Sequence, residues 1–124
     1  MKKITMTVMA LASLGLTACS QKEQTANNPL MSKFETPYEI APFDKITIEN
    51  YREAILKGME DKKAEIQAII DSQDEPTFAN VIVAMEKSGE LLDRANGTFG
   101  PISSSNSTQE MRDLEKELSP IESA

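Results

Sequence analysis

From residue 47 onward, apolar side chains recur at intervals of three, four and seven residues, and this spacing is the strongest constraint on the fold. Such spacing places side chains on one face of an α-helix, whereas a half-buried strand alternates every second residue. No strand-like alternation and no internal repeat is present in the sequence. The chain is therefore predicted to be all-α, with an extended N-terminal strap followed by three antiparallel helices joined by short connections.

Turn and cap signals set the bounds of the first two helices. Thr47 is a good N-cap for a first helix of about 25 residues that carries apolar residues through Ile70. Pro76 forbids continuation of that helix, because proline lacks a backbone donor and biases the preceding residue to an extended conformation. Thr77 is expected to cap a second helix that runs through Phe99 and ends at Pro101.

The third helix is predicted from a cap signal and a shorter apolar period. Ser107 and Glu110 have the spacing of a capping box, and Pro120 is expected to kink or end the helix that follows them. Small residues in the second helix suggest that a neighbouring backbone approaches it closely, namely Gly89, Ala95 and Gly97. The apolar helical spacing continues as far as Ile121, close to the end of the sequence, so we expect the chain to be a truncated part of a longer one.

The chain start reads as a sorting signal. Lys2 and Lys3 precede an apolar run of about 13 residues, which is too short to span a bilayer as a helix. Residues 16–19, Leu-Thr-Ala-Cys, look like a bacterial lipobox with cleavage between Ala18 and Cys19 and lipid attachment at Cys19. The alternative is an ordinary secretory signal with an incidental cysteine. We expect a signal peptide at 1–18, a flexible tether at 19–28 and a folded segment at 29–124.

The lipobox also predicts a location. A lipidated Cys19 would anchor the chain to a membrane of the bacterial cell envelope, outside the cytoplasm. Ser20 stands where an aspartate would favour retention in the inner membrane, so the outer membrane is favoured.

The composition excludes most catalytic chemistry for this chain alone. It has no histidine, and its one cysteine is the expected lipid attachment point. Asp71, Asp74 and Glu75 cluster in one turn, but they read better as a solvated helix end than as a metal site. Removal of Lys2 and Lys3 leaves 11 basic residues against 20 acidic ones, and this acidity argues against nucleic-acid binding.

Several short motifs carry a resemblance to a known family. They lie in the proline-rich strap, in the first helix and around the following turn, and include Asn28-Pro29-Leu30, Pro37-Tyr38, Pro42-Phe43-Asp44-Lys45-Ile46, Pro76-Thr77-Phe78-Ala79-Asn80 and Ser88-Gly89-Glu90-Leu91-Leu92. Through them, residues 28–124 resemble the N-terminal part of peptidyl-dipeptidases of the thimet-oligopeptidase-like zinc metallopeptidase family.

The resemblance implies a fragment of a large helical fold divided by a deep channel. In that family a His-Glu-x-x-His motif and a downstream glutamate hold zinc, and nothing in this sequence matches them. The resemblance therefore implies no catalytic, cofactor-binding or metal residue here, with zinc and short peptide substrates belonging to the full-length parent. It also implies that Phe34, Tyr38 and Phe43 fasten the strap to the helical body.

Two function classes follow from these observations. The first is the N-terminal, non-catalytic segment of a lipid-anchored peptidyl-dipeptidase that releases C-terminal dipeptides from short peptides. The full-length parent is expected to be the enzyme, a zinc peptidyl-dipeptidase, whereas this segment alone should be inactive. The alternative is a free-standing helical envelope lipoprotein that binds a partner protein through open helix faces, with a simple envelope spacer as a third reading.

Overall fold

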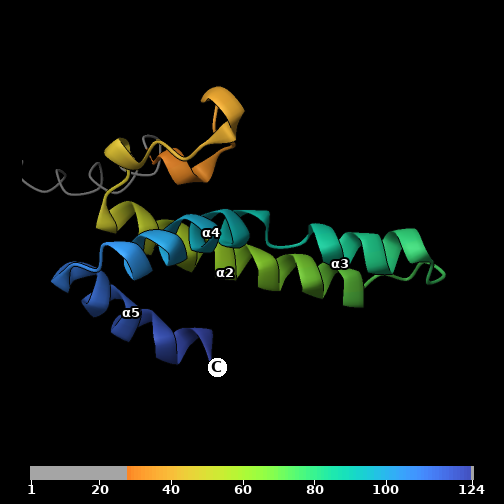
Figure 1. The fold of residues 1–124 in the computed structure, drawn as a ribbon. Helices are drawn as coiled ribbons and strands as arrows, with labels where there is room; N and C mark the ends of the chain where they lie inside the picture. The colour runs from red at the N-terminus through yellow and green to blue at the C-terminus, as the bar shows by residue number, and fades with distance from the viewer. Residues whose placement is uncertain (1–27, 124) are drawn as a thin grey trace, which may run out of the picture.

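A computed structural model describes residues 28–123, apart from the side chain of Glu122. Helices and turns account for the regular structure of these residues, which contain no strand, so the all-α class is confirmed for them. Short turns of 3-10 helix and a π-helical segment accompany four α-helices (Figure 1): Pro29–Met31, Pro37–Glu39, Phe43–Lys45, α2 (Ile48–Ile70), the π-helical Phe78–Val83, α3 (Ala84–Lys87), α4 (Glu90–Ser105) and α5 (Gln109–Glu122).

The two threonine caps are confirmed. The Thr47 hydroxyl accepts a hydrogen bond from the Asn50 backbone N–H at 3.2 Å, and the Asn50 side chain accepts one from the Thr47 N–H at 3.0 Å. Thr77 and Asn80 repeat this reciprocal arrangement at the start of the π-helical segment. Each pair satisfies backbone donors that a helix start leaves without an intrahelical partner.

The single second helix predicted from Thr77 to Phe99 was wrong, because the chain breaks at Ser88 and Gly89. Gly89 has φ of 82°, a left-handed conformation that glycine adopts without the steric cost of a Cβ atom. Its backbone N–H donates to Glu65 Oε2 at 2.7 Å, so a side chain of α2 holds the break in place. The chain before the break is π-helical and then α-helical, and α4 begins after it.

The predicted helix end at Pro101 was also wrong, and of the two outcomes expected at Pro120, a kink or a helix end, the end does not occur at that residue. Pro101 lies inside α4, which continues to Ser105, and Pro120 lies inside the last turn of α5. The carbonyl that Pro101 cannot bond belongs to exposed Gly97, where water can replace the missing donor. Serine hydroxyls cover later carbonyls of α4, since Ser104 and Ser105 donate to the carbonyls of Gly100 and Pro101.

The cap of α5 lies one residue beyond its predicted position. The Thr108 hydroxyl, and not that of Ser107, accepts the hydrogen bond from the Met111 N–H, at 3.3 Å. Ser107 instead accepts from the Arg112 side chain through both its hydroxyl and its carbonyl. Neighbouring hydroxyl residues are equivalent as sequence signals, so only the local geometry selects the cap.

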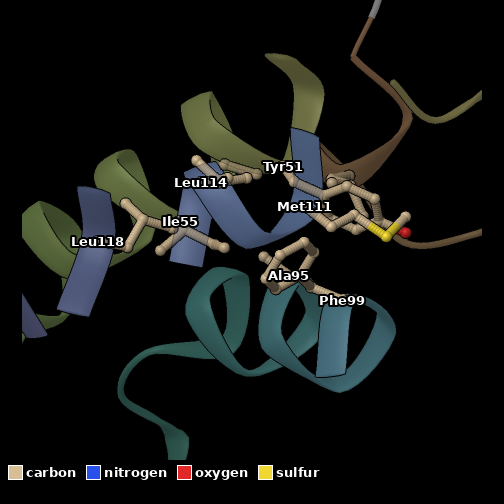
Figure 2. Close-up of a cluster of buried hydrophobic side chains, with 9 residues drawn as sticks. Tyr51, Ile55, Ala95, Phe99, Met111, Leu114 and Leu118 are labelled. Carbon is tan, nitrogen blue, oxygen red and sulfur yellow. The ribbon is translucent and has the colours of Figure 1, made fainter. Parts of the chain in front are cut away.

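The core forms where α2, α4 and α5 meet near one end of α2 (Figure 2). The side chains of these three helices point toward one another there, and the rings of Tyr51 and Phe99 lie 5.1 Å apart between centroids. The buried members of this cluster are Leu30, Tyr51, Ala54, Ile55, Ala95, Phe99, Met111, Leu114 and Leu118.

The backbones of α2 and α4 approach each other closely at Gly58. A Cβ atom added there would lie 2.7 Å from the Leu92 backbone nitrogen. At Gly97, one of the small residues predicted to lie at the close approach, an added Cβ would meet nothing within 4 Å. The contact between α2 and α4 therefore depends on Gly58 and on buried Ala95.

The N-terminal segment is fastened by Leu30. This side chain is fully buried, and its carbonyl accepts a hydrogen bond from Arg94 Nη1 of α4 at 2.9 Å. Asn28, 5% exposed, donates to the Asn50 carbonyl and to Glu53 of α2, both at 3.0 Å. Of the three expected aromatic contacts, Phe34 packs against the core, but Tyr38 is 95% exposed and Phe43 is 46% exposed. The prediction for Tyr38 and Phe43 was wrong because aliphatic Leu30 takes that role.

Candidate interaction surface

The described residues do not assemble a catalytic or metal site. Ala18 and Cys19, the expected cleavage and lipid-attachment residues, lie outside the described residues. Asp71, Asp74 and Glu75 are exposed in the turn after α2, and within residues 28–123 no group of three metal-ligating side chains could hold an ion. The zinc implied by the resemblance thus finds no fitting donors in this part of the chain.

A cleft of about 700 Å³ lies between the N-terminal turns of α2 and α5. Its charged residues already have structural roles. Arg52 donates to Glu117 of α5 at 2.8 Å and to Glu49, and the hydrogen bond with Glu117 is the main cause that raises the Arg52 pKa. Glu49 and Glu110 lie in first helical turns, where negative charge favours the helix dipole. The cleft therefore marks the contact between α2 and α5 and is not a candidate ligand site.

A set of large apolar side chains remains exposed at the other end of the molecule, where the chain turns between α2 and α3 (Figure 1). We call these four residues the distal apolar surface: Ile70 at 67% exposure, Phe78 at 73%, Ile82 at 52% and Met85 at 51%. The last three recur at intervals of four and three, which places them on one face of the helical run from Phe78 to Lys87. Val81 and Ala84, on another face, are half-buried.

Acidic residues surround the distal apolar surface. Residues 64–86 contain no lysine or arginine but carry five carboxylates, of which Asp74, Glu75 and Glu86 have no ion-pair partner within residues 28–123. The other two are engaged locally, because Glu65 accepts from Gly89 and Asp71 accepts from Gln67. This end of the molecule thus combines exposed apolar side chains with an excess of carboxylates, five against the two flanking lysines, Lys63 and Lys87.

A second, smaller group of exposed apolar residues lies in the N-terminal segment. Tyr38, Ile40 and Phe43 are 95%, 58% and 46% exposed. Tyr38 and Glu39 have φ of 60° and 55°, left-handed values that cost roughly 1–2 kcal/mol per residue for side chains other than glycine. The Thr36 hydroxyl donates to the Ile40 carbonyl across this turn and helps to hold it.

The sequence places Phe78, Ile82 and Met85 in the apolar period of the second helix and predicts open helix faces, but it does not show which of these residues are exposed. The signal that could have separated them was the charge pattern, because the only residues between Lys63 and Lys87 that carry charge are acidic. Two helices that pack on each other usually carry both acidic and basic residues beside their apolar faces.

None of the helices between residues 28 and 123 combines the length and the hydropathy that a membrane span requires.

Comparison with known proteins identifies relatives of this segment. No family model matches the chain. It is 37% identical over 95 residues to the dipeptidyl carboxypeptidase of Escherichia coli (strain K12), and these residues are 77% of this chain and 14% of the relative. It is 33% identical over 94 residues to the dipeptidyl carboxypeptidase of Salmonella typhimurium (strain LT2), again 14% of the relative. The chain is thus related to peptidyl-dipeptidases and spans about a seventh of the length of these two.

Proposed function

We propose that this chain is the N-terminal, non-catalytic segment of a lipid-anchored zinc peptidyl-dipeptidase of the thimet-oligopeptidase-like family. The strap at residues 29–46 and the helices that follow it form one wall or lid of a channel that admits short peptides. The parent enzyme releases C-terminal dipeptides from those peptides, and this segment shapes the entrance and contributes no catalytic group.

The similarity to two dipeptidyl carboxypeptidases is the observation that carries this proposal. It extends over 95 residues and therefore includes most of the described fold. The exposed apolar side chains give independent support, because large apolar groups gathered at one end of a domain mark a contact with more protein.

Zinc and catalysis belong to the rest of the parent enzyme. The chain has no histidine, and residues 28–123 offer no group of carboxylates that could replace imidazole as metal ligands. The segment by itself is therefore proposed to be inactive.

The coding frame beyond the Ala124 codon tests the proposal most directly. We expect it to continue for several hundred codons and to encode His-Glu-x-x-His. The purified product of the whole frame should release dipeptides from the C-terminus of a blocked tetrapeptide, whereas residues 1–124 alone should not. An immediate stop codon would contradict the proposal.

The lipid anchor is a separate part of the proposal, supported by the lipobox at residues 16–19. It is tested by expressing the chain in a bacterium with labelled palmitate. The wild-type chain should incorporate label and fractionate with outer membranes, and Cys19→Ala should do neither. Equal labelling of the two would show that Cys19 is not the attachment point.

A second function is favoured by the same exposed side chains. The chain could act as a free-standing helical lipoprotein of the envelope that binds a partner protein. A stop codon directly after Ala124 together with a monodisperse product would favour this function over the first.

A further inference from the structure

The distal apolar surface and the carboxylates around it define the chemistry of what covers them. We propose that Ile70, Phe78, Ile82 and Met85 dock onto an apolar protein surface whose rim carries lysine and arginine. This inference rests on the proposed function for one point only, namely that the rest of the same peptidase chain supplies the complementary surface.

The exposure of these four side chains indicates an apolar partner surface. Each of the four side chains is at least half exposed, whereas the buried cluster at the other end of α2 contains Ile55 and Leu114 with no exposed surface. Phe78 is the most exposed of the four, and an aromatic side chain is a typical central anchor of a protein interface. Its position at the start of the helical run places it beside the acidic turn.

The distribution of charged residues indicates a partner with a basic rim. Elsewhere in the described residues some carboxylates pair with a cation of a neighbouring helix, as in Arg52 with Glu117 and Lys62 with Asp93. At the distal end Asp74, Glu75 and Glu86 have no such match within the described residues, and no basic side chain lies between residues 64 and 86. A partner with basic residues at its rim supplies the missing charges.

The same charges argue against a second copy of this chain as the occupant. Two distal ends placed face to face would bring their unmatched carboxylates together, and like charges across an interface oppose association. A complementary surface of opposite charge has no such cost.

Binding of two matched peptides to the purified chain tests the chemistry. Both peptides are helices of roughly five turns with the same leucine stripe, flanked by lysine in one and by glutamate in the other. We expect the lysine-flanked peptide to bind about tenfold or more tightly than the glutamate-flanked one at low salt, with the difference shrinking as salt screens the charges.

Variants locate the binding site. Phe78→Ser should weaken binding of the lysine-flanked peptide by about tenfold, because it removes the central apolar anchor. Asp74→Lys with Glu86→Lys should remove most of the preference for that peptide. Glu35→Lys with Glu115→Lys is the matched control, because it changes the net charge equally at exposed carboxylates elsewhere and should leave the preference intact.

Three results would overturn the inference. The first is equal affinity for the two peptides, and the second is an equal loss of preference in the control pair, which would indicate only a general charge effect. The third is a dimer in sedimentation that Phe78→Ser dissociates, which would make a second copy the occupant. The coding frame tests the proposed function separately, since a frame that encodes His-Glu-x-x-His is compatible with either peptide result.

Discussion

The two ends of α2 differ in burial although they belong to one continuous helix. In the half that includes Tyr51, Ala54, Ile55 and Gly58 these four residues are buried, whereas no residue from 59 to 70 is buried. Apolar residues recur at helical spacing in both halves. The difference teaches that periodicity defines a face of a helix, while burial of that face depends on which neighbours reach it.

The neighbour that makes the difference is α5. Its Met111, Leu114 and Leu118 close the core over the first half of α2, as the side chains in Figure 2 show. At the other half, the run from Phe78 to Lys87 contributes no buried residue. Two helical segments alone cover too little surface to bury large side chains, and a third is what the distal end lacks among the described residues.

The largest expected difference between the ends is in the cost of removing an apolar side chain. Leu114→Ala should lower the free energy of unfolding by about 3 kcal/mol, because it leaves a cavity in a fully buried site. Ile82→Ala, at a side chain 52% exposed, should change it by about 0.5 kcal/mol or less. Urea denaturation of both variants measures this, and equal losses would show that the distal end is packed in solution.

Glycine substitutions in α2 and α4 should change stability in opposite directions, depending on whether the glycine lies at the contact between the two helices. Gly58→Ala forces a Cβ atom to within 2.8 Å of the Leu92 Cα and should cost about 1–3 kcal/mol. Gly97→Ala adds a methyl group where nothing lies within 4 Å and should stabilise the helix by about 0.5–1 kcal/mol. Thermal melts of the two variants test the pair, and stabilisation by Gly58→Ala would mean that the helices lie further apart.

The Tyr51 hydroxyl predicts a loss of stability at alkaline pH that originates at the core end. Burial raises the Tyr51 pKa above its ordinary value of 10.0, and a hydrogen bond with Thr98 offsets part of this rise. Because the folded state holds the proton more tightly, the contribution is present below pH 10.0 and is lost as the pH rises from there through the folded-state pKa. Denaturation between pH 8 and 11 should show a smaller decline of stability in Tyr51→Phe than in the wild type. An identical decline in wild type and variant would assign the loss to other groups.

The smallest effect is expected from ion pairs. Glu117→Gln breaks the contact of Arg52 with α5 and should cost about 0.5–1 kcal/mol, decreasing with salt, because both side chains are partly exposed. Asp61→Asn breaks a pair with Lys57 inside α2 and should have a smaller effect, because it joins no second helix. A double-mutant cycle of Arg52→Gln and Glu117→Gln measures the first coupling, and a coupling of zero would leave apolar contacts alone to hold α5.

The helical content was predictable because it depends on local signals. The caps at Thr47 and Thr77 and the long α2 follow from hydroxyl residues before an apolar period, and the structure confirms them. The break at Gly89 was not predictable in the same way, because it depends on Glu65 of another helix bonding the glycine N–H. The predicted helix end at Pro101 failed for a similar reason. A helix tolerates a proline only where water or another donor can reach the carbonyl that the proline leaves without a hydrogen bond, here that of Gly97.

The candidate surface was predictable in composition but not in position. Phe78 and the acidic turn at 71–75 are plain in the sequence, yet the sequence does not show which helix covers which. Leu30 is the converse case, because an isolated leucine in a proline-rich segment gives no sign that it will be fully buried. Both outcomes depend on contacts between residues far apart in the chain, which no local pattern encodes.

The attachment of the N-terminal segment also determines how the fold carries mechanical load. A pulling force applied from the N-terminal side acts first on Asn28 and Leu30. Asn28 is hydrogen-bonded to Asn50 and Glu53 of α2, and the Leu30 carbonyl is hydrogen-bonded to Arg94 of α4. A force applied there is thus divided between two helices that meet at the core. If the chain is tethered at its N-terminal side, the tether joins the best-packed part of the described fold.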